Sequence, residues 1–215
     1  MKRVTRSISQ VKPVLWGCST NAIAVWHTPH MGLSASPFSF RDQLAFYGAY
    51  HTNRVNVGIH ILCVPLIWVS TLGLVLQSGV SVTALVTQMP SVVRSPALHG
   101  LGELQSIVPA YVYPHLNVAS LVSFLYLMYY YVLDIPSALL ITPLWAGYYA
   151  LAWVGAEVLQ GRSGPLLAVF VLSWLLQFYG HGVHEGRAPA LLDNLLGAVV
   201  LAPLFVFIEV LFCFG

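Results

Sequence analysis

The sequence has few charged residues: Asp, Glu, Lys and Arg make up 7% of its 215 residues, against about 25% in a soluble globular domain. A soluble particle of this size could not cover its surface with so few charges. Hydrophobic residues make up 58% of the chain, and its mean hydropathy is +0.78. This composition predicts a multi-span membrane protein.

Cysteines and blocks of basic residues are also scarce. Cys18, Cys63 and Cys213 are odd in number and widely separated, so they form neither a disulfide framework nor a CxxC metal pair. The net charge is only +2, and no block of lysine and arginine could follow a phosphate backbone. We therefore exclude nucleic acid as a partner, and we also exclude a disordered chain and a coiled coil.

Long apolar runs account for most of the chain after residue 56. A bilayer core of about 30 Å requires roughly 20 apolar residues in a helix. Pro203 and Glu209 weaken the last run, and Glu209 has no assignable role, so we expect four to five spans. The predicted fold class is an all-α, multi-pass membrane helical bundle. The candidate spans are residues 57–76, 116–133, 135–156, 164–180 and 195–214.

The segments between the runs differ in length and composition. The junction at Asp134 is so short that it predicts a tight helical hairpin between the second and third runs. Residues 77–115 mix small, polar and apolar residues without a sustained period, which is typical of a loop or an interfacial insert. We expect a flexible N-terminal tail over residues 1–37 and one integral membrane domain over residues 38–215.

The basic residues favour one orientation in the membrane. If all five runs span, seven basic residues lie on the side of the N-terminus and two lie opposite, which favours a cytoplasmic N-terminus. The seven are Lys2, Arg3, Arg6, Lys12, Arg41, Arg54 and Arg187, and the two are Arg94 and Arg162.

Two pairs of histidines flank the apolar runs. His51 and His60 stand at the start of the first run, and His181 and His184 follow the fourth. Because four crossings separate the pairs, both should lie at the same membrane face, on the side of the N-terminus. Imidazoles suit iron, zinc, copper and nickel, so the four histidines are a candidate metal site.

The spacing within each pair sets a condition on the local structure. His181 and His184 are three residues apart, so on an α-helix they share one face and can ligate one ion. His51 and His60 are nine residues apart, which would place them on opposite sides of one straight helix. The helix must therefore break between them, and Asn56 is the expected N-cap of the first span.

Several polar residues beside the histidines are candidates for a role in the site. Glu185 could be a ligand, a partner that orients a ligand, or a general base. The other candidates are Asn53, Asn56 and Gln177 in the cofactor site, and Arg54 and Arg187 as cations for a substrate carboxylate.

The same histidines have simpler interpretations. A histidine at the end of a helix is commonly just a hydrogen-bonded end residue, and His27 and His30 repeat the HxxH spacing in the tail. Buried histidines could also serve as a proton relay or as packing groups in a membrane transporter or scaffold.

At these residues the sequence resembles the membrane family of iron-dependent 2-hydroxy fatty acid dioxygenases, which act in the endoplasmic reticulum in phytosphingosine breakdown. The resemblance covers residues 38–214. The matching pieces are Tyr50-His51-x-Asn53-x-x-Asn56-x-x-x-His60 and Gln177-Phe178-x-Gly180-His181-x-x-His184-Glu185-x-x-x-Pro189-Ala190-Leu191.

The resemblance implies that the protein is located in the endoplasmic reticulum membrane. It also implies a Fe(2+) cofactor held by His51, His60, His181 and His184. The implied reaction is the α-oxidation of a long-chain 2-hydroxy fatty acid by O2. An alternative enzyme class is the di-iron lipid desaturase or hydroxylase, whose histidine boxes include HxxHH. The chain contains no HxxHH sequence, which favours the dioxygenase.

Overall fold

The structure is a computed structural model that describes residues 36–82, 109, 112–189, 191 and 194–214. Apart from connecting turns and an isolated bridge between Ser81 and Asn117, the elements within these ranges are helical, as predicted. Residues 1–35 of the predicted tail and residues 83–108 of the predicted loop lie outside the described residues.

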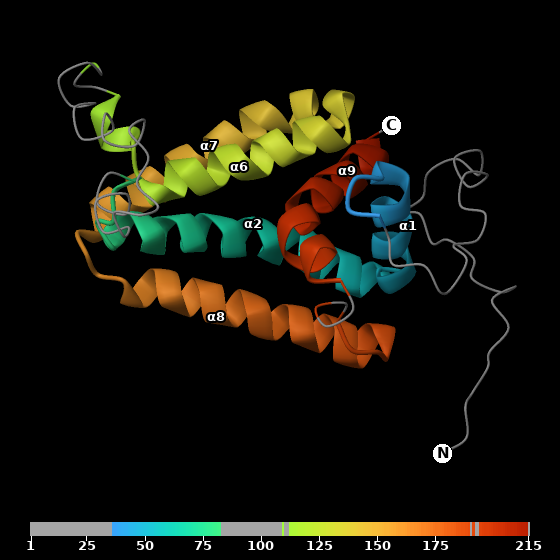
Figure 1. The fold of residues 1–215 in the computed structure, drawn as a ribbon. Helices are drawn as coiled ribbons and strands as arrows, with labels where there is room; N and C mark the ends of the chain where they lie inside the picture. The colour runs from blue at the N-terminus through green and yellow to red at the C-terminus, as the bar shows by residue number, and fades with distance from the viewer. Residues whose placement is uncertain (1–35, 83–108, 110–111, 190, 192–193, 215) are drawn as a thin grey trace, which may run out of the picture. The chain divides into compact units, whose positions relative to one another are not determined.

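Figure 1 shows the helices coloured along the chain. The α-helices are α1 (Phe40–Tyr50), α2 (Arg54–Gln77), α6 (Val118–Leu133), α7 (Ile135–Leu159), α8 (Gly164–Tyr179) and α9 (Ala202–Phe214). The shorter helices are the 3-10 turn Tyr113–His115 and two π-helical segments, Gly180–Glu185 and Leu196–Leu201.

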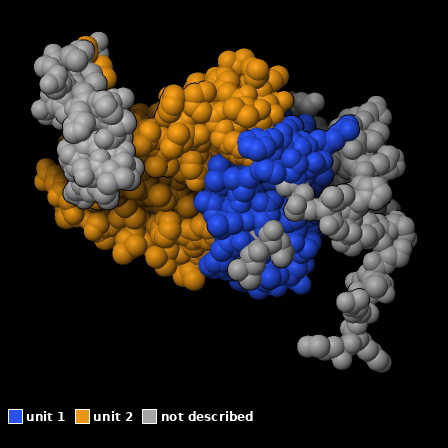
Figure 2. All heavy atoms as spheres, viewed as in Figure 1, with its two compact units in different colours: residues 1–61, 178–215 blue, residues 62–177 orange. Residues whose placement is uncertain are grey.

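The chain divides into two compact units, which Figure 2 shows in separate colours. Unit 1 contains residues 1–61 and 178–215, and therefore α1, the start of α2, the π-helical segments and α9. Unit 2 contains residues 62–177 and is built from the rest of α2 and α8 with α6 and α7.

Three helices of the described residues are long and apolar enough to cross a membrane: α2, α7, and α8 together with its π-helical extension to Glu185. The other two predicted runs are also helical, but Val118–Leu133 and Leu196–Phe212 are shorter. The 16 residues of α6 extend about 24 Å, less than a bilayer core of about 30 Å. The predicted runs are thus confirmed as helices, while the described full-length candidate spans number three rather than four to five.

The α6–α7 hairpin of unit 2 turns on a single residue, as the sequence predicts. Asp134 ends α6, where its N–H donates to the Tyr130 carbonyl at 2.9 Å. The same residue caps α7, where its Oδ2 accepts from the Ser137 N–H at 2.9 Å. One side chain thereby satisfies a backbone donor at the start of α7 that would otherwise lack a partner.

Aromatic side chains pack the interior of unit 2. Trp145 of α7 donates its indole N–H to the Ser123 carbonyl of α6 at 2.9 Å. The ring of Trp68 from α2 stacks on Trp145 with centroids 4.6 Å apart. Tyr130 beside them is fully buried. These contacts hold α2 against the hairpin.

In unit 1, α1 packs against the C-terminal part of the chain. The ring of Phe205 in α9 lies 5.1 Å from the ring of Tyr47 in α1. Nearby, Asn194 donates from Nδ2 to the Gln43 side-chain oxygen at 2.9 Å. Since Phe205 is fully buried, α9 closes one side of α1.

The predicted break between His51 and His60 is confirmed. α1 ends at Tyr50, and His51 follows as its C-cap with φ −128° and ψ 72°. α2 begins at Arg54, because Asn53 provides the cap by accepting the Val55 N–H on its Oδ1 at 2.9 Å. The expectation that Asn56 is the N-cap is therefore wrong: Asn56 lies in the first turn of α2.

The helix that carries the second histidine pair changes its geometry at Gly180. Regular α8 ends at Tyr179 and continues as the π-helical segment Gly180–Glu185, in which hydrogen bonds span five residues rather than four. Gly186 ends the segment with a positive φ of 66°, a conformation that favours glycine.

Candidate metal centre

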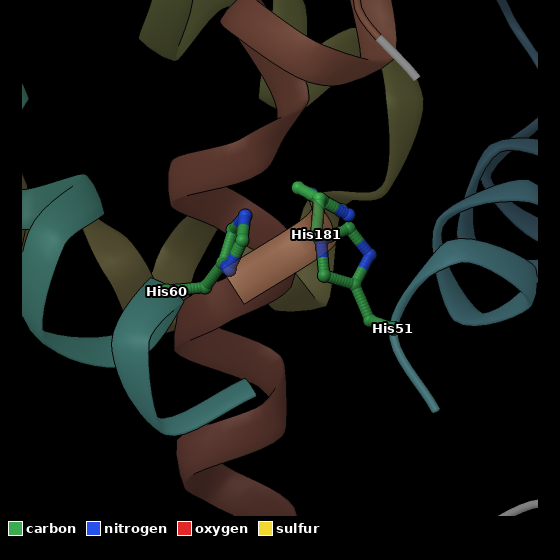
Figure 3. A group of neighbouring side chains, drawn as sticks. All are labelled: His51, His60 and His181. Carbon is green, nitrogen blue, oxygen red and sulfur yellow. The ribbon is translucent and has the colours of Figure 1, made fainter. Parts of the chain in front are cut away.

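Three imidazoles from three separate segments meet within unit 1, as Figure 3 shows. His51 comes from the α1–α2 junction, His60 from the second turn of α2, and His181 from the π-helical segment. One ligand atom of each lies within 4.8 Å of the others. The ring centroids are 4.5 to 5.0 Å apart and the ring planes cross at 70 to 81°. The three rings therefore surround a common point.

Hydrogen bonds determine which nitrogen atoms of two rings are free. Nδ1 of His51 donates to the Tyr47 carbonyl at 2.8 Å, and Nδ1 of His60 donates to the Asn56 carbonyl at 2.9 Å. In a neutral imidazole the other nitrogen, Nε2, then carries no proton and can bind a metal. Metal-binding histidines commonly donate their second nitrogen to a backbone carbonyl in this way.

Two of the three histidines are buried, and His51 is half-buried. His60 is 3% exposed and His181 is 4% exposed. Burial, reinforced by the neighbouring His60, lowers the pKa of His51 well below its usual value, so this imidazole stays neutral. Nε2 of His51 and Nδ1 of His181 are buried without a hydrogen-bond partner. Buried polar atoms without partners are costly, and a metal ion would satisfy both, so these residues fit a metal site.

Glu185 joins the two segments that carry the histidines. Its Oε1 accepts hydrogen bonds from the N–H groups of Thr52 and Asn53, each at 2.8 Å, and from Nδ2 of Asn56 at 3.1 Å. Its Oε2 accepts from the Thr52 hydroxyl at 2.8 Å. The carboxylate thus holds the α1–α2 junction and the start of α2 against the π-helical segment.

Close packing at Gly180 reinforces this connection. Asn56 is completely buried. A Cβ atom added at Gly180 would overlap Asn56 Oδ1 and would lie 3.3 Å from Cδ1 of Ile59. Only glycine therefore lets the chain approach α2 this closely immediately before His181.

The structure brings together three of the four predicted histidines. His184 lies outside the group, half-buried, with its ring 5.3 Å from the ring of Tyr179. The sequence argument assumed an α-helix, in which residues three apart share a face. The π-helical segment has more residues per turn, so positions 181 and 184 diverge.

The other predicted site residues occupy different positions. Asn53 and Asn56 both bind Glu185. Arg187 lies with its guanidinium carbon 3.7 Å above the Tyr50 ring and donates from Nη1 to the Ala49 carbonyl at 2.9 Å. Arg54 is exposed at the first position of α2, and Gln177 is buried in α8, within unit 2.

Sequence reasoning missed two residues beside the cluster, Tyr47 and Thr52. Thr52 bonds to Glu185 through both its N–H and its hydroxyl. Tyr47 stands four residues before His51, as Asn56 stands four before His60, and each supplies a carbonyl to its histidine. Because any residue offers a backbone carbonyl four positions before a histidine, this spacing gave no signal in the sequence.

Together, these features define a protein whose described residues form long apolar helices and a tri-histidine cluster that could hold a metal ion. The family described as 2-hydroxy-palmitic acid dioxygenase Mpo1-like matches residues 38–213. The 2-hydroxy-palmitic acid dioxygenase MPO1 of Saccharomyces cerevisiae is 34% identical over 179 residues, which cover 81% of each chain. The chain therefore belongs to the Mpo1-like dioxygenase family, a family of oxidoreductases. Solved structures offer no match to the chain.

The packing at Gly180 makes a direct prediction. Gly180→Ala should lower the free energy of unfolding by about 1–3 kcal/mol, because the new methyl group must displace the Asn56 side chain. Thermal unfolding of the purified protein in detergent measures the change. The matched control is Gly182→Ala in the same π-helical segment, where a Cβ would meet no atom within 4 Å. Equal melting temperatures for the two variants would contradict the close approach.

Proposed function

We propose that this protein is an Fe(II)-dependent dioxygenase that converts a long-chain 2-hydroxy fatty acid into the fatty acid one carbon shorter. The observation that carries the proposal is the cluster of His51, His60 and His181, in which two buried nitrogens lack a partner. Family membership supports the substrate, since the yeast relative is named a 2-hydroxy-palmitic acid dioxygenase.

His51, His60 and His181 are the proposed iron ligands. Three neutral imidazoles leave other coordination positions open, as in catalytic metal sites. Ferrous iron, when bound, would supply the redox chemistry by which O2 cleaves the C1–C2 bond. The atoms balance if C1 leaves as CO2: the 2-hydroxy acid and one O2 give the shorter acid, CO2 and water. No separate reductant is then needed.

Arg187 is the proposed partner of the substrate carboxylate. The Tyr50 ring and the Ala49 carbonyl hold its guanidinium beside His51. A guanidinium has five N–H donors in a planar fork, and the Ala49 carbonyl takes a bond from Nη1, so the fork retains donors for a carboxylate. Arg54 and Arg187 are both exposed, and we favour Arg187 because its contacts with Tyr50 and Ala49 orient the guanidinium.

Glu185 is proposed to position the site rather than to react. Both carboxylate oxygens already accept hydrogen bonds from Thr52, Asn53 or Asn56. A general base or a metal ligand needs a lone pair directed at the substrate or at the ion. Asn53 and Asn56 act through Glu185, and Asn56 also supplies the carbonyl for His60.

The alternatives receive less support. A di-iron desaturase or hydroxylase needs about eight ligands, whereas the group found within the described residues contains His51, His60 and His181. A proton-relay transporter would not require two buried histidine nitrogens without hydrogen-bond partners. Membership of a dioxygenase family also favours the enzyme.

We place the enzyme in the endoplasmic reticulum membrane, with its metal site on the cytoplasmic side. The three long apolar helices support a membrane location. The resemblance to the lipid-oxidising family supports the compartment, and the excess of basic residues on the side of the N-terminus supports the orientation.

Replacing His51, His60 or His181 singly by Ala should remove bound iron and lower turnover by more than about 100-fold, the largest effect typical of residues that only orient ligands. Anaerobic metal analysis, together with the yield of shortened acid from a long-chain 2-hydroxy acid under O2, measures both. The control is His115→Ala, an exposed histidine of unit 2. His184→Ala should keep its iron. Retained iron and activity in any two of the three ligand variants would refute the shared site.

Arg187→Ala should raise KM for the 2-hydroxy acid by about 10–100-fold, because hydrogen bonds to a charged group contribute about 1.5–3 kcal/mol. Arg54→Ala removes the same charge from an exposed position and should leave KM nearly unchanged. Steady-state kinetics with the two variants decides between the two cations. An increase in KM confined to the Arg54 variant would assign the carboxylate to Arg54 instead.

Glu185→Ala should lower both the melting temperature and the iron content, since four donors lose their acceptor. Glu185→Gln retains one oxygen and can donate to the Thr52 hydroxyl, so this variant should keep most of its iron and turnover. A stable Gln variant that binds iron but is as inactive as the Ala variant would show that Glu185 reacts chemically.

A further inference from the structure

We propose that Tyr47 and Glu209 form a positioning pair, which fixes the His51 ring in the metal centre from the side of α9. The inference depends on one part of the proposed function, namely that the tri-histidine cluster binds a metal ion. It assigns a role to Glu209, which the sequence leaves unexplained, and it makes α9 part of the centre although α9 carries no proposed ligand.

Tyr47 contacts His51 in two ways and α9 in a third. Its carbonyl accepts the Nδ1–H of His51 at 2.8 Å. Its ring stacks on the His51 ring, with centroids 3.9 Å apart and planes at 16°. Its hydroxyl donates to Oε2 of Glu209 at 3.2 Å. A rotation of the His51 ring must therefore displace the Tyr47 ring or break one of these bonds.

Glu209 supplies the fixed end of this chain of contacts. It is the only charged residue of α9, whose sequence is APLFVFIEVLFCF. A carboxylate in such apolar surroundings is costly unless it has a hydrogen-bond partner, and the Tyr47 hydroxyl provides one. The Phe205 ring, one turn earlier in α9, packs 5.1 Å from the Tyr47 ring and limits its sideways movement.

The pair complements Glu185 without duplicating it. Glu185 holds the backbone at Thr52 and Asn53, which fixes where the chain leaves α1. It makes no bond to the His51 ring. Tyr47 and Glu209 instead set the orientation of that ring, and hence the direction of its Nε2. Residues that orient a metal-binding histidine typically change metal affinity about 10–100-fold when replaced.

The experiment titrates the full-length protein in detergent with Co2+ and records its visible absorption spectrum, which reports the arrangement of the ligands. Tyr47→Phe removes the donor and Glu209→Leu removes the acceptor. Each should weaken Co2+ binding about tenfold or more and shift the spectrum. The double variant should be no weaker than the weaker single variant, because both act through one hydrogen bond. Glu209→Gln keeps an acceptor oxygen and should bind Co2+ nearly as the unchanged protein does.

Tyr131→Phe is the matched control, since it also removes a tyrosine hydroxyl bond, to Thr142 at 3.0 Å in unit 2. It should leave Co2+ binding and the spectrum unchanged, even if its melting temperature falls. An unchanged spectrum in Tyr47→Phe, or effects that add in the double variant, would overturn the positioning pair and leave the metal site intact. Failure of the unchanged protein to bind any Co2+ would overturn both the pair and the proposed function.

Discussion

The four hydrogen bonds that converge on Glu185 are the constraint on which the metal centre depends. They connect residues that are about 130 positions apart in the sequence and that belong to the two segments carrying the histidines. Neutral imidazoles do not hold one another together before an ion arrives. A carboxylate that accepts two backbone N–H groups, a hydroxyl and an amide can align the segments beforehand, which lowers the cost of ordering the site.

Much of the fold could be predicted, because it follows from local properties of the chain. Each apolar run forms a helix. The hairpin between α6 and α7 was recognisable because the single residue Asp134 separates their two apolar runs. The break between His51 and His60 also followed from helical geometry, since nine residues reverse the face of a helix. The approach of His51 and His60 to His181 required one further step, the counting of chain crossings, and the structure does bring these three rings together.

The remaining features of the candidate site had no strong local signal in the sequence. His184 lies apart from the other rings because the helix takes a π-helical form from Gly180, and periodicity arguments assume regular α-helix. Asn53 rather than Asn56 caps α2, since both are good cap residues and only the surrounding contacts decide between them. The roles of Glu185 and Tyr47 depend on hydrogen-bond partners more than 130 residues away in the sequence, and no short motif encodes such contacts.

The carbonyl anchors of His51 and His60 have a consequence for evolution. Both acceptors belong to the main chain, four residues before the ring they bind. A side-chain replacement at position 47 or 56 does not remove the backbone oxygen. The helical backbone alone therefore keeps the proton of each imidazole on Nδ1. Mutation can loosen or shift the rings, but it cannot easily invert which nitrogen faces the ion. The chemistry of the ligands is in this sense more robust than their geometry.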